Sequence, residues 1–214
     1  MPFEQDASIL MIGERTNSNG SKAFREAMLS ADYQKCLDIA KDQTPRRRTH
    51  ARPQRRLRGR DGAADMSELA SRLATSSTLP IMLDSTEPAV LQAGLEHLGG
   101  RCAVNSVNYE DGAGPPESRF HKIMTLVKEH GAAVVALTID EEGQARTAET
   151  KVAIAKRLIE DIKGNWGLAE SDIIVDALTF PPSRPVRKRY DATASRPSKR
   201  SVSSRLRTRN CTSP

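Results

Sequence analysis

The sequence is poor in aromatic residues, in cysteine and in long apolar runs. Its 214 residues include one Trp, three Tyr and four Phe. The three cysteines, Cys36, Cys102 and Cys211, are far apart, which favours neither a disulfide framework nor a zinc site of clustered cysteines. We expect Cys36 and Cys102 to be small buried apolar side chains.

Membrane and secretory signals are missing as well. No apolar stretch approaches the ~20 residues of a membrane-spanning helix, and the first residues lack a charged-then-apolar signal pattern. The sequence therefore predicts a cytoplasmic protein with no membrane partner. Its length suits one substantial domain with a sizeable core.

Positive charge is abundant but unevenly distributed. The net charge is +6, yet residues 45–60 contain eight Arg and no acid, and residues 181–214 contain ten Lys or Arg and only Asp191. The rest of the chain is therefore acidic. We predict a body over residues 1–180, interrupted by an aberrant Arg-rich segment at 45–59, and a basic, disordered tail over 181–214.

Short apolar runs alternate with segments of helical periodicity along the body. The expected strands are 8–13, 79–84, 102–106, 131–140 and 172–176, and the expected helices are 21–28, 32–41, 66–73, 89–98, 118–130 and 148–163. This alternation predicts an α/β fold with a parallel sheet. Several strands end in Asp, Asn or Glu and no Gly-rich dinucleotide fingerprint is present, so we favour a (β/α)8-type barrel over a doubly wound sheet. Five clear strands are too few to close an eight-stranded barrel, so we expect the barrel to be incomplete.

The stretch from Leu79 to Thr86 has the most informative pattern. A short apolar run leads directly into Asp84, Ser85 and Thr86. At the carboxyl end of a parallel strand Asp84 would be a functional carboxylate, because sites are built there. The alternative is that Asp84 caps the helix that starts near Glu87 and Pro88. This stretch alone leaves both interpretations open.

Four motifs occur in an order that resembles a known family: Glu14-Arg-Thr-Asn17, Leu83-Asp-Ser-Thr86, Val104-Asn-Ser106 and Ile174-Val-Asp176. Together they resemble the pterin-binding (folate) domain of cobalamin-dependent methionine synthases. The wider group includes methyltetrahydrofolate:corrinoid methyltransferases and, more remotely, dihydropteroate synthases. The similarity covers roughly residues 8–44 and 60–180.

The resemblance implies a TIM barrel whose mouth binds 5-methyltetrahydrofolate. The methyl group would pass to cob(I)alamin held by a separate domain, with no metal ion in the folate domain itself. By position, Asp84, Asn105 and Asp176 match residues that bind the pterin ring. Glu14 and Asn17 match polar residues at the end of the first strand.

The sequence departs from this family at the second strand, expected between residues 45 and 60 with an Asp-Leu-Asn-Val type motif. Read from the second base of the His50 codon, the permitted codons give Met-Leu-Asp-Leu-Asn-Val-Asp-Tyr-Val. A similar shift from Pro181 gives a loop and a helix-like string. We therefore hypothesise that residues 45–59 and 181–214 are out-of-frame translation, which makes the chain a truncated, frameshifted fragment. With the second and last strands missing, we expect the chain alone to be inactive or impaired.

Two other functions compete with this interpretation. The Arg-rich segments could bind nucleic acid through phosphate contacts, at least incidentally. Tyr190 is their sole aromatic residue for stacking, and the acidic body would repel phosphates. The second alternative is a dihydropteroate synthase-like enzyme of the same fold. The motifs that begin at Glu14 and Asp84 argue against it.

Overall fold

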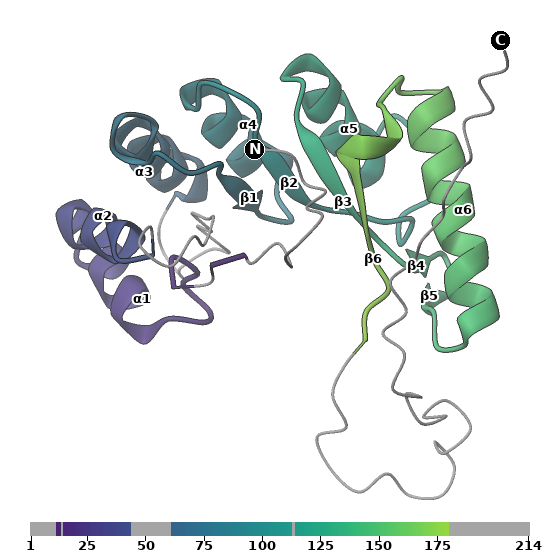
Figure 1. Cartoon of the computed structure of the whole chain (residues 1–214), viewed down its shortest axis with the longest axis horizontal. Coiled ribbons are helices and arrows are strands. Elements are labelled where there is room, and N and C mark those ends of the chain that lie inside the picture. The colour runs from purple at the N-terminus through teal and green to yellow at the C-terminus, as the bar shows by residue number, and fades with distance from the viewer. Residues whose placement is uncertain (1–11, 14, 44–60, 113, 180–214) are drawn as a thin grey trace, which may run out of the picture. The chain divides into compact units, whose positions relative to one another are not determined.

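The computed structural model describes residues 12, 13, 15–43, 61–112 and 114–179 (Figure 1). Helices and strands alternate along this part of the chain, and all of them lie within the unit Met1–Leu178. The helices are α1 Lys22–Leu29, α2 Tyr33–Lys41, α3 Gly62–Ser76, α4 Pro88–His97, α5 Arg119–Glu129 and α6 Ala148–Gly164. The strands are β1 Met82–Asp84, β2 Ala103–Val107, β3 Ala133–Leu137, β4 Ile139–Asp140, β5 Gly143–Gln144 and β6 Ile173–Asp176, the last preceded by a 3-10 turn, Glu170–Asp172.

Four strands form a parallel sheet in the order β1-β2-β3-β6, as the alternation predicts. Asp84 is level with Asn105, Asn105 with Val135, and Val135 with Ile174. The carboxyl ends of all four strands therefore meet at one edge of the sheet. Strands β4 and β5 form a separate antiparallel hairpin.

Side-chain caps start most of the helices where the sequence changes from loop to helical periodicity. Ser118 accepts a hydrogen bond from the backbone N–H of His121, and Thr147 does the same for Thr150. Helix α4 instead begins with a proline, Pro88, at its first turn, and Glu87 occupies the N-cap position. The suggestion that Asp84 caps this helix is therefore wrong.

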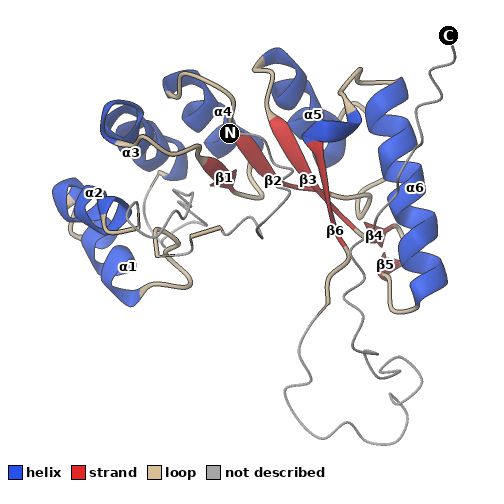
Figure 2. Cartoon of the chain, viewed as in Figure 1, coloured by secondary structure: helices blue, strands red, loops and turns tan. Residues whose placement is uncertain are grey.

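The two faces of the sheet differ sharply. The outer face packs against the helices, which follow one another along one side of the sheet in Figure 2. Its strand residues alternate with those of the inner face, since successive side chains point to opposite sides. The outer face contributes Leu83, Val104, Val134 and Ala136 to the main core, whereas the inner face holds a small cluster of Met82, Ala103, Ala133 and Val135.

Helix α4 approaches β1 closely because of a glycine. A Cβ atom on Gly94 would lie 2.8 and 2.9 Å from the two terminal methyl groups of Leu83 and 3.2 Å from Cγ of Met66. Leu83 and Met66 are both buried. The glycine therefore lets the helix pack directly on the strand that ends in Asp84.

Two sequence predictions need correction, and three others lie wholly or mostly outside the described residues. The expected strand 131–140 is divided at Thr138 into β3 and β4, because the chain leaves the parallel sheet there to form the hairpin. The helical periodicity of residues 148–163 predicts a buried stripe of Ala155, Leu158, Ile159 and Ile162, but the stripe that the structure buries is Ile154, Leu158 and Ile162. The i, i+4, i+8 spacing points these three at the sheet, which leaves Ala155 and Ile159 half-buried. Most of the expected strand 8–13, together with 45–59 and 181–214, lies outside the described residues.

Candidate functional site

The polar ends of β1 and β2 lie side by side. Asp84 is the last residue of β1 and is 5% exposed. Asn105 is its partner on β2, and the backbone N–H of Ser85 donates a 3.2 Å hydrogen bond to the carbonyl oxygen of Asn105. This backbone contact fixes how the two strand ends leave the sheet.

Asp84, Asn105 and Asp176 all project from the inner face. Each lies two residues after an inner-face apolar side chain: Met82, Ala103 and Ile174 respectively. Since strand side chains repeat with period two, the polar groups share the face of those apolar ones. The inner face is thus apolar along its length and polar at its carboxyl edge.

Asp176 lies two strands away from Asn105, with β3 between them. Neighbouring strands are about 4.8 Å apart, so the two strands are separated by roughly 10 Å across the sheet. Asn105 is level with Ile174, so Asp176 also lies two residues further along its strand. The end of β3 holds Asp176 in place: Thr138 donates to the Asp176 carbonyl oxygen from its backbone N–H at 3.1 Å and from its hydroxyl at 3.4 Å. The Asp176 carboxylate accepts a 2.7 Å bond from the N–H of Leu178 and is exposed.

The two N-terminal candidates have different outcomes. Asn17 is buried in the turn before α1, and its side-chain oxygen accepts a 2.9 Å hydrogen bond from the N–H of Asn19. That side chain therefore serves the local turn, and its role in a binding site remains a prediction. Glu14 lies outside the described residues.

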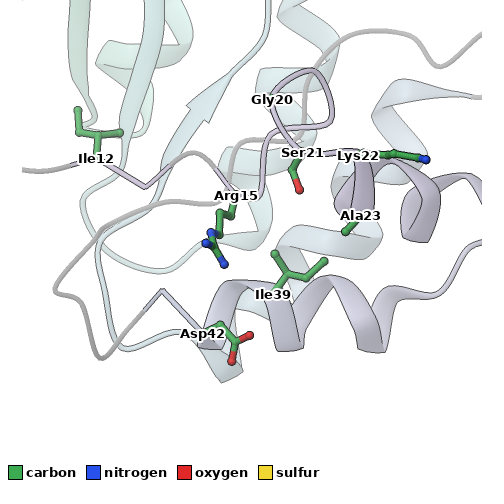
Figure 3. Close-up of a pocket in the computed structure, with 8 residues that line it drawn as sticks. All are labelled: Ile12, Arg15, Gly20, Ser21, Lys22, Ala23, Ile39 and Asp42. Atoms are coloured by element: carbon green, nitrogen blue, oxygen red, sulfur yellow. The ribbon is translucent and has the colours of Figure 1, made fainter.

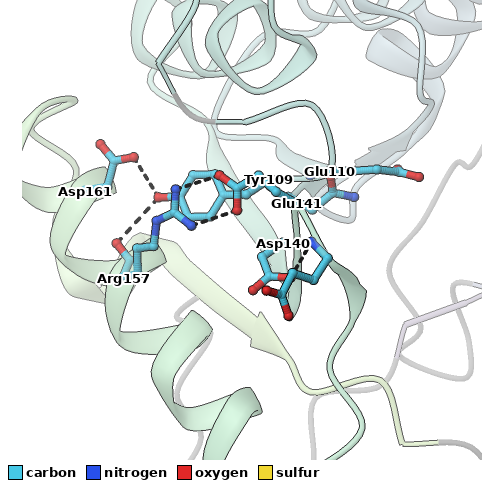
Figure 4. Close-up of polar contacts among 8 residues, drawn as sticks. Tyr109, Glu110, Asp140, Glu141, Arg157 and Asp161 are labelled. Carbon is cyan, nitrogen blue, oxygen red and sulfur yellow. Dashed lines mark hydrogen bonds and ion pairs between the residues drawn. The ribbon is translucent and has the colours of Figure 1, made fainter.

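A polar network around the buried Tyr109 side chain was not anticipated from the sequence (Figure 4). The Tyr109 ring is fully buried, and its hydroxyl donates a 2.6 Å hydrogen bond to the Asp161 carboxylate of α6. The Arg157 guanidinium stacks on the Tyr109 ring at 4.2 Å and donates two hydrogen bonds, of 2.9 and 2.8 Å, to Glu141 in the turn between β4 and β5.

Contacts in this network shift the pKa values of Glu141, Arg157 and Tyr109. The hydrogen bonds from Arg157 lower the pKa of Glu141 to about 2, and the same contact raises the pKa of Arg157. Burial raises the pKa of Tyr109, and its hydrogen bond to Asp161 raises it further. Tyr109 therefore stays protonated, a hydrogen-bond donor rather than a base.

A pocket lies beside α1 and α2 (Figure 3). Its volume is about 540 Å³, and its lining is Ile12, Arg15, Gly20, Ser21, Lys22, Ala23, Ile39 and Asp42. In Figure 3 the Arg15 side chain extends toward Ile39 and Asp42. Asn17, Asp84, Asn105 and Asp176, the predicted pterin-binding residues that the structure describes, do not line this pocket, although Arg15 belongs to the motif that ends at Asn17.

The described residues were also compared with the expectations for cysteines, metal ligands and membrane-spanning helices. Cys36 and Cys102 are free and buried as predicted, and burial raises the pKa of each thiol to about 11. Within the described ranges, no group of three or more His, Cys, Asp or Glu side chains could hold a metal ion. Among the helices the structure describes, none is long and apolar enough to cross a membrane.

The fold is α/β, and polar side chains stand at the strand ends of its inner face. Comparison with known families gives the class of protein that has this arrangement. The sequence profile of the family described as pterin binding enzyme matches residues 13–195, and the chain belongs to that family. The predicted α/β class is thereby confirmed, and the strands that the structure describes form part of a barrel of the (β/α)8 type.

The relatives identify the branch of the family. Methionine synthase of Mycobacterium tuberculosis (strain ATCC 25618 / H37Rv) is 75% identical over 187 residues, and methionine synthase of Mycobacterium leprae (strain TN) is 70% identical over 181 residues. Each match covers 84% of this chain and 15% of the relative. The resemblance to the pterin-binding part of methionine synthase is confirmed, and the chain spans about 15% of the length of these relatives.

Solved structures show more distant similarity. The 7,8-dihydropteroate synthase of Vibrio fischeri ES114 has a TM-score of 0.49 and 13% identity, with 67% of this chain and 55% of that chain covered. The dihydropteroate synthase of Yersinia pestis has a TM-score of 0.48 and 11% identity, with 68% and 53% covered.

Proposed function

We propose that this chain is a cytoplasmic methionine synthase-type domain that binds 5-methyltetrahydrofolate at the carboxyl edge of its inner face. The methyl group would pass to cob(I)alamin on a separate domain. One observation carries the proposal: Asp84, Asn105 and Asp176 share one face and one edge of the sheet. The family membership and the methionine synthase relatives support the choice of a folate as ligand.

The residue types suit a pterin. Its edge offers N–H donors beside acceptors, and two carboxylates with one carboxamide complement such an array. The apolar inner-face residues Met82, Ala103 and Val135 are buried, so the ring would meet the polar strand ends rather than these side chains.

The carboxylates would also favour methyl transfer. Protonation of N5 makes the methyl carbon a better electrophile, and nearby negative charge raises the proton affinity of the pterin. As the C–N bond breaks, the bonding electron pair stays on N5, which keeps its proton, and tetrahydrofolate results. Cobalamin, when bound to its own domain, supplies the acceptor for the methyl group.

A titration of the purified chain with 5-methyltetrahydrofolate tests the proposal. We expect Asp84→Asn to weaken binding by about 1.5–3 kcal/mol, roughly tenfold to a hundredfold, because a charge-assisted hydrogen bond is lost at nearly constant shape. Asp38→Asn is the matched control, since Asp38 lies exposed on α2, where its carboxylate accepts a hydrogen bond from Gln34. Equal affinities for Asp84→Asn and Asp38→Asn would exclude the proposed site.

The Arg-rich segment is expected to weaken folate binding. We propose that residues 45–59 replace a strand of the site by out-of-frame translation, and that the tail 181–214 has no part in folate binding. A chain in which residues 50–58 become Met-Leu-Asp-Leu-Asn-Val-Asp-Tyr-Val should then bind folate more tightly and unfold at higher temperature. If the replacement weakens both properties, or if the gene permits no one-base shift there, the out-of-frame hypothesis is wrong.

A further inference from the structure

The polar network around Tyr109 joins three segments that follow the strand ends. These are the loop after β2, the β4–β5 hairpin after β3, and helix α6, which leads to β6. The loop follows β2 and the hairpin follows β3, and both strands end at the carboxyl edge where the pterin is proposed to bind. The network therefore lies where it can control the geometry of that edge.

Tyr109 fixes the loop after β2 through both its backbone and its side chain. Tyr109 follows Asn105 by four residues, and its backbone N–H donates a 3.0 Å hydrogen bond to the carbonyl oxygen of Ile139 in β4. Its hydroxyl bonds Asp161 at 2.6 Å and its ring lies under Arg157. Any displacement of α6 or the hairpin is thus passed to the chain close to Asn105.

The hairpin is held at its tip and at its base. At the tip, Glu141 receives the two hydrogen bonds from Arg157 in α6. At the base, the N–H of Ala145 bonds the carbonyl oxygen of Thr138 at 3.1 Å, and Thr138 in turn bonds the Asp176 carbonyl oxygen. The hairpin therefore connects Arg157 to the backbone of Asp176.

We propose that Arg157 is a positioning residue that sets the placement of Asn105 and Asp176 for the pterin through Tyr109 and the β4–β5 hairpin. The proposal rests on the proposed function, because it assigns a role at the same site. Arginine suits this role because its planar fork meets a carboxylate at two points while its face stacks on an aromatic ring, which lysine cannot reproduce. Small misplacements of positioned groups are costly, since a displacement of ~1 Å can slow a reaction by up to about a hundredfold.

The test uses the full chain with Arg157→Met, and Arg72→Met as the matched control. Arg72 also bonds a glutamate, Glu68, and also stacks on a tyrosine, Tyr33 at 5.3 Å, with similar exposure of both ion-pair partners, but it lies on α3 away from the network. We expect Arg157→Met alone to weaken 5-methyltetrahydrofolate binding by about tenfold, the effect of losing one charge-assisted hydrogen bond through misplacement of Asn105 or Asp176. Both variants should show similar thermal unfolding midpoints without ligand.

Amide hydrogen exchange of the ligand-free chain provides a second readout that does not depend on folate. Arg157→Met should speed exchange in residues 105–109 and 138–145, whereas Arg72→Met should not. Exchange in both segments as slow as in the unmodified chain would overturn the proposal. In the reversed pair, Arg157→Glu with Glu141→Arg, part of the lost protection and affinity should return, which a purely local packing defect would not allow.

The two proposals fail in distinguishable ways. If Asp84→Asn weakens folate binding and Arg157→Met does not, the pterin site stands and the positioning role is wrong. If Arg157→Met speeds exchange near Asn105 but Asp84→Asn leaves binding unchanged, the network positions this edge for something other than a pterin, and the role proposed for Arg157 toward the pterin is wrong as well.

Discussion

The outer and inner faces of the same four-stranded sheet serve different purposes. The outer face contributes to a large core with side chains from helices α1 to α6, and many of its members are fully buried. The inner face has a four-residue apolar cluster and then changes to Asp84, Asn105 and Asp176 at its carboxyl edge. Alternation along short strands lets one segment serve both faces.

Because the two faces differ in this way, substitutions on the outer face should change stability, and substitutions at the inner edge should change ligand affinity. Removing apolar volume from the outer face costs both transfer free energy and a cavity, so its effect should appear in the free energy of unfolding. Replacing a polar group at the inner edge changes few packing contacts, so its effect should appear in ligand affinity. Substitutions on the two faces can therefore break or sharpen the comparison.

The largest expected effect is on the outer face. Leu158→Ala should lower the free energy of unfolding by about 2–5 kcal/mol, because Leu158 on α6 is fully buried against the sheet. Ile159→Ala is the matched control on the same helix; Ile159 is half-buried and should lose less. Denaturant unfolding measures both, and a larger loss at Ile159 would contradict the packing described for α6.

A smaller loss is expected at the contact between α4 and β1. Gly94→Ala should destabilise the chain by about 1–3 kcal/mol, because the added methyl group overlaps the buried Leu83 side chain. Gly99→Ala, where a Cβ atom meets nothing within 4 Å, should change the unfolding midpoint very little. Thermal unfolding of the two variants, measured side by side, tests the close approach of α4 to β1, and equal midpoints would contradict it.

The smallest effect concerns the pH dependence of the hairpin contact. The pKa of Glu141 is lowered from 4.5 to about 2, so its ion pair stabilises the folded chain above about pH 4.5 and is lost as the pH falls toward 2. Because both partners are about half exposed, the contribution should be ~1 kcal/mol or less. Glu141→Gln should therefore be less stable than the parent at pH 6, and the difference should shrink toward pH 2. A difference that grows on acidification would contradict the ion pair.

Much of the fold could be predicted because it depends on local periodicity. Helix α5 falls within the predicted range 118–130 and buries Phe120, Ile123, Met124 and Val127 at helical spacing, and the ends of β1 and β6 fall at Asp84 and Asp176. The break at Thr138 could not be predicted, since the apolar run continues through it. The turn into the hairpin depends on pairing with Gly143 and Gln144.

The candidate site was predicted only in part, for the same reason. Asp84, Asn105 and Asp176 are marked by their place after apolar runs. The Tyr109 network is not, because its central hydrogen bond joins residues 52 positions apart, Tyr109 and Asp161, and no periodic pattern records such a contact. Its one signal in the sequence is an aromatic residue soon after a strand, in a chain with few aromatic residues.

Amide hydrogen exchange with and without 5-methyltetrahydrofolate tests the central claim most directly, because it locates the ligand without any substitution. We predict that the folate slows exchange at the carboxyl ends of β1, β2 and β6, around Ser85, Asn105 and Leu178. The same folate should leave residues 20–23 and 39–42, which contribute to the pocket beside α1 and α2, unchanged. Protection confined to that pocket, with none at the three strand ends, would contradict the proposed pterin site.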